Sequence, residues 1–115
     1  MVELSPASIV VVPFPFSDLS GAKLRPAVAM LDAGRGDWLL CQVTSNPYSD
    51  PQAIRITTNE LQKGTLTSDA RFARPVKLFT ANASVMAKRV AILKDEVFTA
   101  ILTSTIETLR RNMPK

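Results

Sequence analysis

The chain has 115 residues and a mass of 12.5 kDa, which is enough for one domain, because a typical domain holds roughly 100–150 residues. Hydrophobic residues make up 46% and charged residues 21%, a composition typical of globular proteins rather than disordered chains. Lysine and arginine outnumber aspartate and glutamate by 14 to 10, so the net charge is +4 and the pI is about 9.6. The composition excludes a multidomain enzyme and predicts a single basic domain over residues 1–115.

The sequence shows no membrane-spanning or secretory segment. The longest uninterrupted apolar stretch, residues 9–16, is far shorter than the roughly 18–20 residues that a membrane span needs. The N-terminus carries Glu3 and Pro6 where a secretory signal would have a basic segment followed by an apolar one. We therefore expect a cytoplasmic protein that does not span a membrane.

Cysteine and histidine are the residue types that most restrict the chemistry. Cys41 is the single cysteine and the chain has no histidine, the commonest general base and metal ligand. These counts exclude Cys–His and Ser–His–Asp nucleophiles, zinc sites of the usual Cys/His type and RNA cleavage by a histidine pair. Any catalysis must use other polar side chains or the backbone, and we expect no metal and no cofactor.

The first part of the chain predicts an antiparallel meander of three strands. A β-branched run predicts a strand over 8–12, which ends at two prolines that a central strand would not tolerate. A polar loop over 17–23 leads to a second predicted strand, 25–31, which starts beside a proline. A turn with two glycines at 33–37 precedes a third predicted strand, 38–44.

The middle of the chain is rich in turn-forming residues. Residues 45–51 predict a loop, and the alternation of apolar and polar residues over 53–57 predicts a half-exposed strand. Residues 58–64 then predict a short helical turn, with Thr58 or Asn59 as its cap and a glycine at its end.

The last part of the chain predicts two more strands and one helix. The strands are expected over 73–80 and 85–93, although the apolar spacing of the second also fits a helix. Over 95–111 apolar residues recur every three or four positions, with two acids in the first turn and two arginines in the last, as the helix dipole favours. We therefore expect a mainly β fold with a C-terminal helix packed on it.

Positive charge is concentrated in one stretch. Between residues 70 and 93 the chain has five basic residues and no acidic one. Such a segment is a plausible binding surface for a polyanion, and an ordinary solvated face is the alternative. The five residues are Arg71, Arg74, Lys77, Lys88 and Arg89.

Four sequence blocks and the final helix together resemble the PemK/MazF family of toxins from toxin–antitoxin pairs. The blocks are, in order, Val-Val-Pro-Phe-Pro-Phe-Ser-Asp-Leu at 11–19, Leu-Arg-Pro-Ala-Val at 24–28, Cys-Gln-Val-Thr-Ser-Asn at 41–46 and Arg-Pro-Val-Lys-Leu-Phe-Thr at 74–80. The resemblance covers almost the whole chain. It implies a small SH3-like antiparallel β-barrel like that of PemK, MazF and CcdB, and a homodimer that cuts single-stranded RNA without a metal and is neutralised by a cognate antitoxin.

The implied reaction is compatible with the residue types that the chain has. RNA cleavage without a metal or a histidine requires the 2′-OH to attack its own phosphodiester, which leaves a 2′,3′-cyclic phosphate and a 5′-OH. The protein must hold the in-line geometry, stabilise the charge on the phosphorane and move two protons. Arginine suits the second task, because its guanidinium is permanently ionised and binds two phosphate oxygens at once.

Arg25 is the first candidate for this role, because the resemblance aligns it with a catalytic arginine of the family. It begins the second predicted strand directly after the 17–23 loop, and a surface ion pair is the alternative role. The resemblance places the hydroxyl groups of Thr44 and Ser45 beside this arginine, where they could bind a phosphate oxygen or relay a proton. Their alternative role is to start the turn that Asn46 and the following proline predict.

Arg74 is a further catalytic candidate, since many family members have an arginine at this point. The family's acid–base aspartate has no aligned counterpart, and Asp69, several residues upstream, is the nearest carboxylate. The general base is therefore unassigned, with Asp69 and Asp18 as the candidates. The chain could instead be a non-catalytic SH3-like module that binds nucleic acid or a protein, because a fold does not by itself imply chemistry. The remaining candidates, for contact with RNA, are Asp18, Lys23, Asn46, Arg71 and Lys77.

Overall fold

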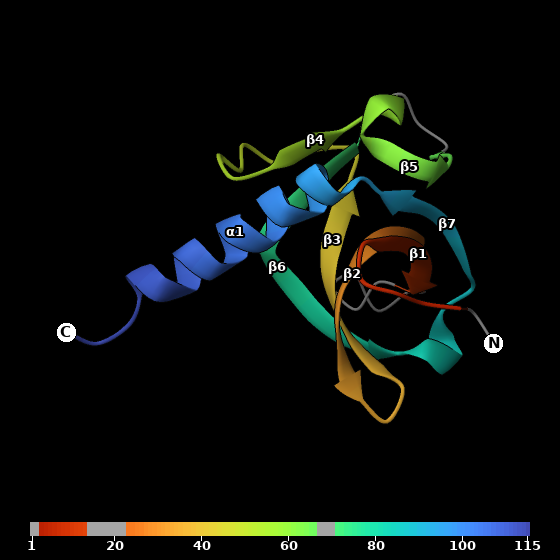
Figure 1. The fold of residues 1–115 in the computed structure, drawn as a ribbon, viewed down its shortest axis with the longest axis horizontal. Coiled ribbons are helices and arrows are strands. Elements are labelled where there is room, and N and C mark those ends of the chain that lie inside the picture. Colours follow the sequence, from red (N-terminus) through yellow and green to blue (C-terminus); the bar gives the residue numbers. More distant parts are fainter. Residues whose placement is uncertain (1–2, 14–22, 67–70) are drawn as a thin grey trace.

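The computed structural model describes residues 3–13, 23–66 and 71–115. Seven strands, two short 3-10 turns and one long helix form over these ranges (Figure 1). In chain order they are β1 (Ser8–Pro13), β2 (Leu24–Gly34), β3 (Asp37–Thr44), β4 (Ile54–Ile56), η1 (Thr58–Glu60), β5 (Leu61–Gly64), β6 (Arg71–Asn82), η2 (Ala83–Val85), β7 (Lys88–Leu93) and α1 (Asp95–Arg111).

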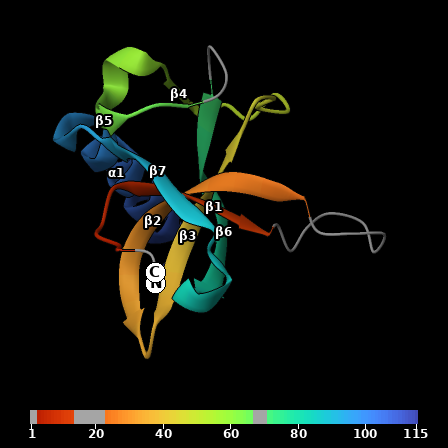
Figure 2. The ribbon, with the colours of Figure 1, turned by 90° about the vertical axis from the view of Figure 1, so that its right-hand side faces the viewer.

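The seven strands form one antiparallel sheet that curls into a nearly closed barrel (Figures 1 and 2). The strand order is β4-β6-β3-β2-β1-β7-β5, so the meander β1-β2-β3 lies at the centre and β4 and β5 lie at the two edges. Register joins Ile9 to Val28, and Val28 to Cys41, in one row across the central strands. The expected small antiparallel barrel with a C-terminal helix is confirmed.

The central strands are buried on both faces, which explains the continuous apolar run in β1. Ile9 packs in a first core with the helix residue Ile101, and both are fully buried. Its neighbour Val10 points to the other face and packs in a second core. Trp38 and Phe79 also belong to this second core. An apolar run without alternation is typical of a strand covered on both sides.

The helix α1 has the bounds that the sequence predicts, and it packs on β6 (Figure 1). Thr105 is buried at this contact, where its Oγ1 donates to the carbonyl oxygens of Pro75 at 2.7 Å and Ile101 at 3.1 Å. No helix in the described ranges is long and apolar enough to cross a membrane.

The segment 58–64 differs from its prediction. Only η1 is helical, and its cap is Thr57, whose hydroxyl accepts from Asn59 N–H while Glu60 Oε1 accepts from Thr57 N–H. The expected caps Thr58 and Asn59, and the helix end at Gly64, were therefore wrong. Residues 61–64 instead form β5, because Leu61 is buried opposite Leu93 of β7.

Candidate functional site

Arg25 and Thr44 lie at the same end of two neighbouring strands. Arg25 is half-buried in β2, opposite Val12 of β1. Thr44 is the last residue of β3 and is only 3% exposed. The pairing of β2 with β3 includes Ala27 opposite Gln42, and a continuation by two residues in the same register would bring Arg25 opposite Thr44. Because opposite residues share a sheet face, the register favours a site shared by a guanidinium and a hydroxyl.

The hydroxyl of Thr44 also starts the turn after β3. Thr44 Oγ1 accepts from Asn46 N–H at 3.2 Å, and Asn46 Oδ1 accepts from Tyr48 N–H at 2.9 Å. These bonds hold the chain in the turn that the sequence predicts at this point. The Thr44 hydroxyl keeps its own proton for donation, since it accepts in this bond. Ser45 is exposed beside it.

Arg74 is held in a polar cluster that the sequence analysis missed. Its Nε donates to Asp50 Oδ2 at 3.0 Å and its Nη1 to Gln42 Oε1 at 3.1 Å, and its guanidinium carbon lies 5.5 Å from the centroid of the Tyr48 ring. We call Gln42, Tyr48, Asp50 and Arg74 the Arg74 cluster. An acidic residue from the 45–53 loop thus compensates the charge of Arg74, although the sequence around it has no acid.

This arrangement stabilises the ionised form of Asp50. Its side chain is only 8% exposed, and this burial by itself favours the neutral acid. Hydrogen bonds from Arg74 and from Gln52 N–H outweigh the burial and hold the pKa of Asp50 below its usual value. Asp50 is therefore a weak proton acceptor and an anchor for the loop.

The lowered pKa predicts an acid-dependent loss of stability. Asp50 stabilises the fold fully above its unfolded pKa, roughly 3.9, and this contribution falls as the pH drops towards the folded pKa. We expect Asp50→Asn to lower the free energy of unfolding at pH 7, with the difference from wild type shrinking below about pH 4. Urea unfolding of both proteins at pH 7 and below about pH 4 measures this difference. A difference in the free energy of unfolding that is the same at the two pH values would contradict the prediction.

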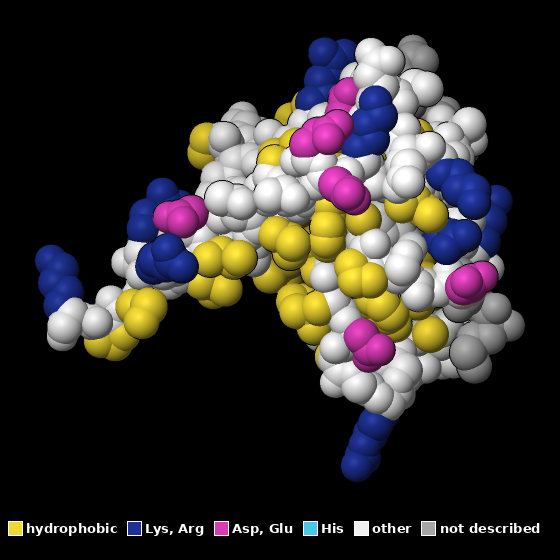
Figure 3. All heavy atoms as spheres, in the orientation of Figure 1, with side chains coloured by type: hydrophobic (Ala, Val, Ile, Leu, Met, Phe, Trp, Pro, Cys, Tyr) yellow, Lys and Arg dark blue, Asp and Glu magenta, His cyan; other side chains and the backbone are white. Residues whose placement is uncertain are grey.

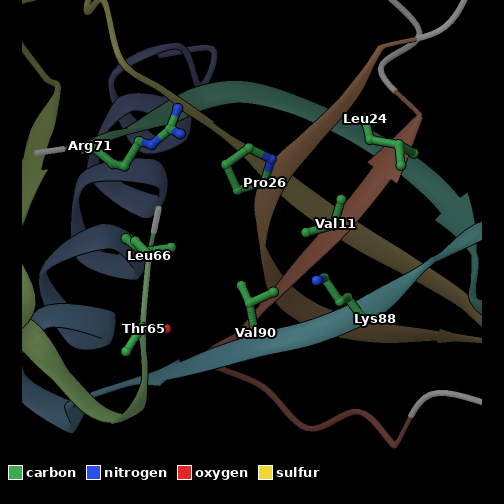
Figure 4. Close-up of a pocket in the computed structure, with 8 residues that line it drawn as sticks. All are labelled: Val11, Leu24, Pro26, Thr65, Leu66, Arg71, Lys88 and Val90. Atoms are coloured by element: carbon green, nitrogen blue, oxygen red, sulfur yellow. The ribbon is translucent and has the colours of Figure 1, made fainter. Parts of the chain in front are cut away.

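The basic residues of 70–93 have different surroundings. Arg71 and Lys88 line a cavity of about 340 Å³, whereas Arg74 belongs to the Arg74 cluster (Figure 4). The other lining residues are Val11, Leu24, Pro26, Thr65, Leu66 and Val90. The two cations extend from opposite sides of this mostly apolar space. Arg71 and Lys88 therefore share this cavity, and Arg74 is not among its lining residues.

Cys41 does not qualify as a nucleophile. It is fully buried, and its Sγ donates to the backbone oxygen of Arg74 at 3.1 Å. Burial raises the pKa of the thiol to about 12, so it stays protonated near neutral pH. Its contact instead fixes β3 against β6 next to the Arg74 cluster.

Comparison with solved structures identifies the architecture. An endoribonuclease in complex with its cognate antitoxin, from a mycobacterial species, superimposes with a TM-score of 0.71 at 10% identity, covering 97% of this chain and 100% of that chain. A MazE–MazF complex from Deinococcus radiodurans gives 0.71 at 17% identity, and MazF from the same organism gives 0.70 at 16%. Both of these cover 93% of this chain and 96% of the other. The chain has the MazF fold.

No family model matches the sequence, and no curated protein sequence does either. The likeness to MazF therefore lies in the three-dimensional arrangement of the strands and the helix. It extends over nearly the full length of both chains, so the barrel and α1 both belong to the shared fold.

Within this MazF fold, the predicted site residues fall into three groups. Arg25 and Thr44 lie on adjacent strand ends, with Ser45 and Asn46 in the turn that follows. Lys23 is exposed just before β2, Lys77 is half-buried in β6, and Arg71 lines the cavity. Asp18 and Asp69, the two candidate bases, lie outside the described residues.

Gln42, Tyr48 and Asp50 are the polar residues that sequence reasoning missed. Gln42 is buried in β3, where a polar side chain needs a partner, and this was one available signal. Asp50 was visible only as one of several turn-forming residues. Its link to Arg74 depends on how the 45–53 loop folds back over β6, which the sequence does not display.

Proposed function

We propose that this chain is an endoribonuclease toxin that cuts single-stranded RNA and is controlled by an antitoxin. The observation that carries the proposal is the full-length likeness to MazF structures and to an endoribonuclease bound to its antitoxin. The placement of Arg25 and Thr44 on adjacent strand ends supports it, since these are the residues that the PemK/MazF resemblance selects.

In the proposed reaction the RNA supplies its own nucleophile. The 2′-OH oxygen attacks the neighbouring phosphorus, the bond to the 5′ oxygen breaks, and the products carry a 2′,3′-cyclic phosphate and a 5′-OH. One proton leaves the 2′-OH and another reaches the departing 5′ oxygen. Arg25 stabilises the charge on the phosphorane, and the Thr44 hydroxyl donates a hydrogen bond to a phosphate oxygen. No step needs a metal.

The general base is proposed to be Asp69 or Asp18, as the sequence suggested. Within the described ranges Asp50 is a carboxylate in contact with the candidate Arg74, but Arg74 holds the pKa of Asp50 low. A carboxylate that is stabilised as an anion accepts a proton poorly. Asp50 is therefore assigned to positioning the loop through Arg74.

Incubation of the purified protein with a long unstructured RNA in EDTA tests the proposal. We expect discrete cuts that persist in EDTA and leave 5′-OH ends. RNA that stays intact but is bound would indicate the alternative, a non-catalytic SH3-like binding module. A reaction that stops in EDTA would contradict the metal-independent chemistry.

The proposed partner is a cognate antitoxin with an acidic, partly disordered segment that covers the RNA site. Two of the superimposed structures are complexes of a toxin-like chain with an antitoxin. A disordered acidic segment can wrap a large surface and reverse the local field of a chain with net charge +4. We place both partners in the cytoplasm, where the RNA substrate is found.

We also propose a homodimer that uses the end of α1. Ile106 and Leu109 are neighbours on one face of α1 and are 48% and 65% exposed, and Met113, just beyond the end of the helix, is 67% exposed. Figure 3 shows hydrophobic side chains along the underside of this helix and over the barrel below it. Ile101, in an earlier turn of α1, is fully buried in the first core and is not available to a partner. An apolar strip on a protruding helix end is typical of an interface.

Sedimentation at micromolar concentration tests the dimer. We expect wild type to sediment as a dimer and Leu109→Glu as a monomer. The dimer would bury the new carboxylate of each protomer without a partner, and two-fold symmetry places both negative charges in the same interface. Arg111→Glu is the control, since position 111 lies on the opposite side of the helix from Ile106. A wild-type monomer, or equal dissociation of both variants, would contradict this interface.

A further inference from the structure

Tyr48 is an exposed aromatic residue that the proposed mechanism does not use. It is the single tyrosine of the chain, and it is 61% exposed in the loop between β3 and β4. Trp38 and Phe79, by contrast, are buried in the second core. An exposed aromatic ring gains little from packing, so its position calls for another role.

The loop holds Tyr48 in a fixed and unusual conformation. Tyr48 and Ser49 both have positive φ angles, 54° and 59°, a backbone conformation that residues other than glycine adopt at a cost in free energy. Hydrogen bonds before and after these two residues stabilise the strained conformation. Asn46 Oδ1 accepts from Tyr48 N–H at 2.9 Å, and Pro47 O accepts from Asp50 N–H at 2.9 Å. The ring is therefore presented by a built turn.

The same loop is anchored to two elements of the fold. Asp50 binds Arg74 of β6, and Gln52 Nε2 donates to Thr108 Oγ1 of α1 at 2.6 Å. These bonds restrict the loop before any ligand arrives. A surface that is ordered in advance loses less entropy on binding, which favours affinity.

The guanidinium of Arg74 lies over the Tyr48 ring at 5.5 Å, which gives the ring a positively charged neighbour. With 61% of the residue exposed, the ring still has surface available for a second planar group. Nucleobases stack on aromatic rings whatever their sequence, because every base has a π-face.

Tyr48 also lies close to the proposed reaction along the chain. It lies four positions after Thr44, and a chain of that length spans at most about 14 Å. An RNA strand held at Arg25 and Thr44 would reach the ring within a few nucleotides.

We propose that Tyr48 is a stacking platform that binds one unpaired nucleobase of the RNA next to the cleavage site, with Arg74 holding the ring from behind. The inference rests on the proposed endoribonuclease function and adds a residue that positions the substrate. It predicts an RNA contact whose strength depends on the aromatic ring and not on charge.

The test uses a fluorescein-labelled 2′-O-methyl RNA oligonucleotide, which lacks the attacking hydroxyl, and measures binding by anisotropy. We expect Tyr48→Ala and Tyr48→Leu to weaken binding by about 5- to 100-fold and Tyr48→Phe to stay within about twofold of wild type. Val85→Ala is the matched control. It shortens another exposed apolar side chain, 50% exposed, in η2. The turn η2 hydrogen-bonds to the β2–β3 turn, at the other end of β3 from Tyr48.

Salt dependence separates stacking from charge. The salt slope depends on the number of phosphate contacts, and removing the Tyr48 ring removes none of them. Tyr48→Ala should therefore lower the affinity at every salt concentration, while the slope of log affinity against log salt stays that of wild type. Wild-type affinity in Tyr48→Ala, or equal weakening in Tyr48→Phe, would overturn the inference. If wild type cleaves RNA while Tyr48→Ala binds RNA normally, the stacking role of Tyr48 is refuted and the proposed function stands. If wild type neither binds nor cleaves RNA, both the stacking role and the proposed function are refuted.

Discussion

Arg25→Ala is expected to reduce RNA cleavage by about 10²- to 10³-fold, because loss of one preformed charge stabiliser at a transition state costs about that much. Arg25 is half-buried at the start of β2 and belongs to neither hydrophobic core. The free energy of unfolding should therefore change little. Single-turnover cleavage of a short RNA, measured beside urea unfolding, gives both quantities.

Two further variants make this result specific. Arg25→Lys keeps the charge but loses the planar fork that binds two phosphate oxygens, so it should remain well below wild type. Arg110→Ala removes an exposed arginine in the last turn of α1 and should cleave normally. Full activity in Arg25→Ala, with an unchanged unfolding curve, would remove Arg25 from the mechanism.

Gly64→Ala is expected to have the largest effect on stability. Gly64 ends β5 with φ +87°, and a Cβ at this position would lie 2.2 Å from the carbonyl oxygen of Val90 and 2.6 Å from Cα of Ala91. Both contacts are with the backbone of β7, so no side chain can move aside. We expect the free energy of unfolding to fall by about 4 kcal/mol, a large share of the stability of a small domain.

Gly34→Ala is the matched control for this substitution. Gly34 has a similar φ, +92°, but a Cβ there would have no atom within 4 Å. It should cost about 1–3 kcal/mol, from backbone strain alone. Urea unfolding of both variants separates the clash from the strain, and equal losses would show that β5 does not approach β7 as closely as described.

The sequence predicts the elements whose signals are local. The β-branched run before Pro13 predicts β1, and apolar spacing with charged ends predicts α1 to the residue. β5 was missed because its four residues are too short for a periodic pattern. Their strand conformation comes from pairing with β7, almost thirty residues further along the chain.

The candidate site shows the same limit. Arg25 and Thr44 are visible as a resemblance to a family motif, and the strand register supports their proximity. The Arg74 cluster could not be foreseen, since it joins residues 24 and 32 positions apart through a loop that folds back on β6. Charge counted along the sequence therefore overstated the positive surface that Arg74 provides.

The most direct test of the central claim is the chemistry of the cut ends. A short RNA carrying one cleavage site is incubated with the protein in EDTA, and its fragments are weighed by mass spectrometry beside an RNA with a single 2′-deoxynucleotide on the 5′ side of the cut. The account predicts a 2′,3′-cyclic phosphate on one fragment, a 5′-OH on the other, and no cleavage of the deoxy-substituted RNA. Cleavage of that RNA, or fragments with 3′-OH and 5′-phosphate ends, would contradict attack by the 2′-OH.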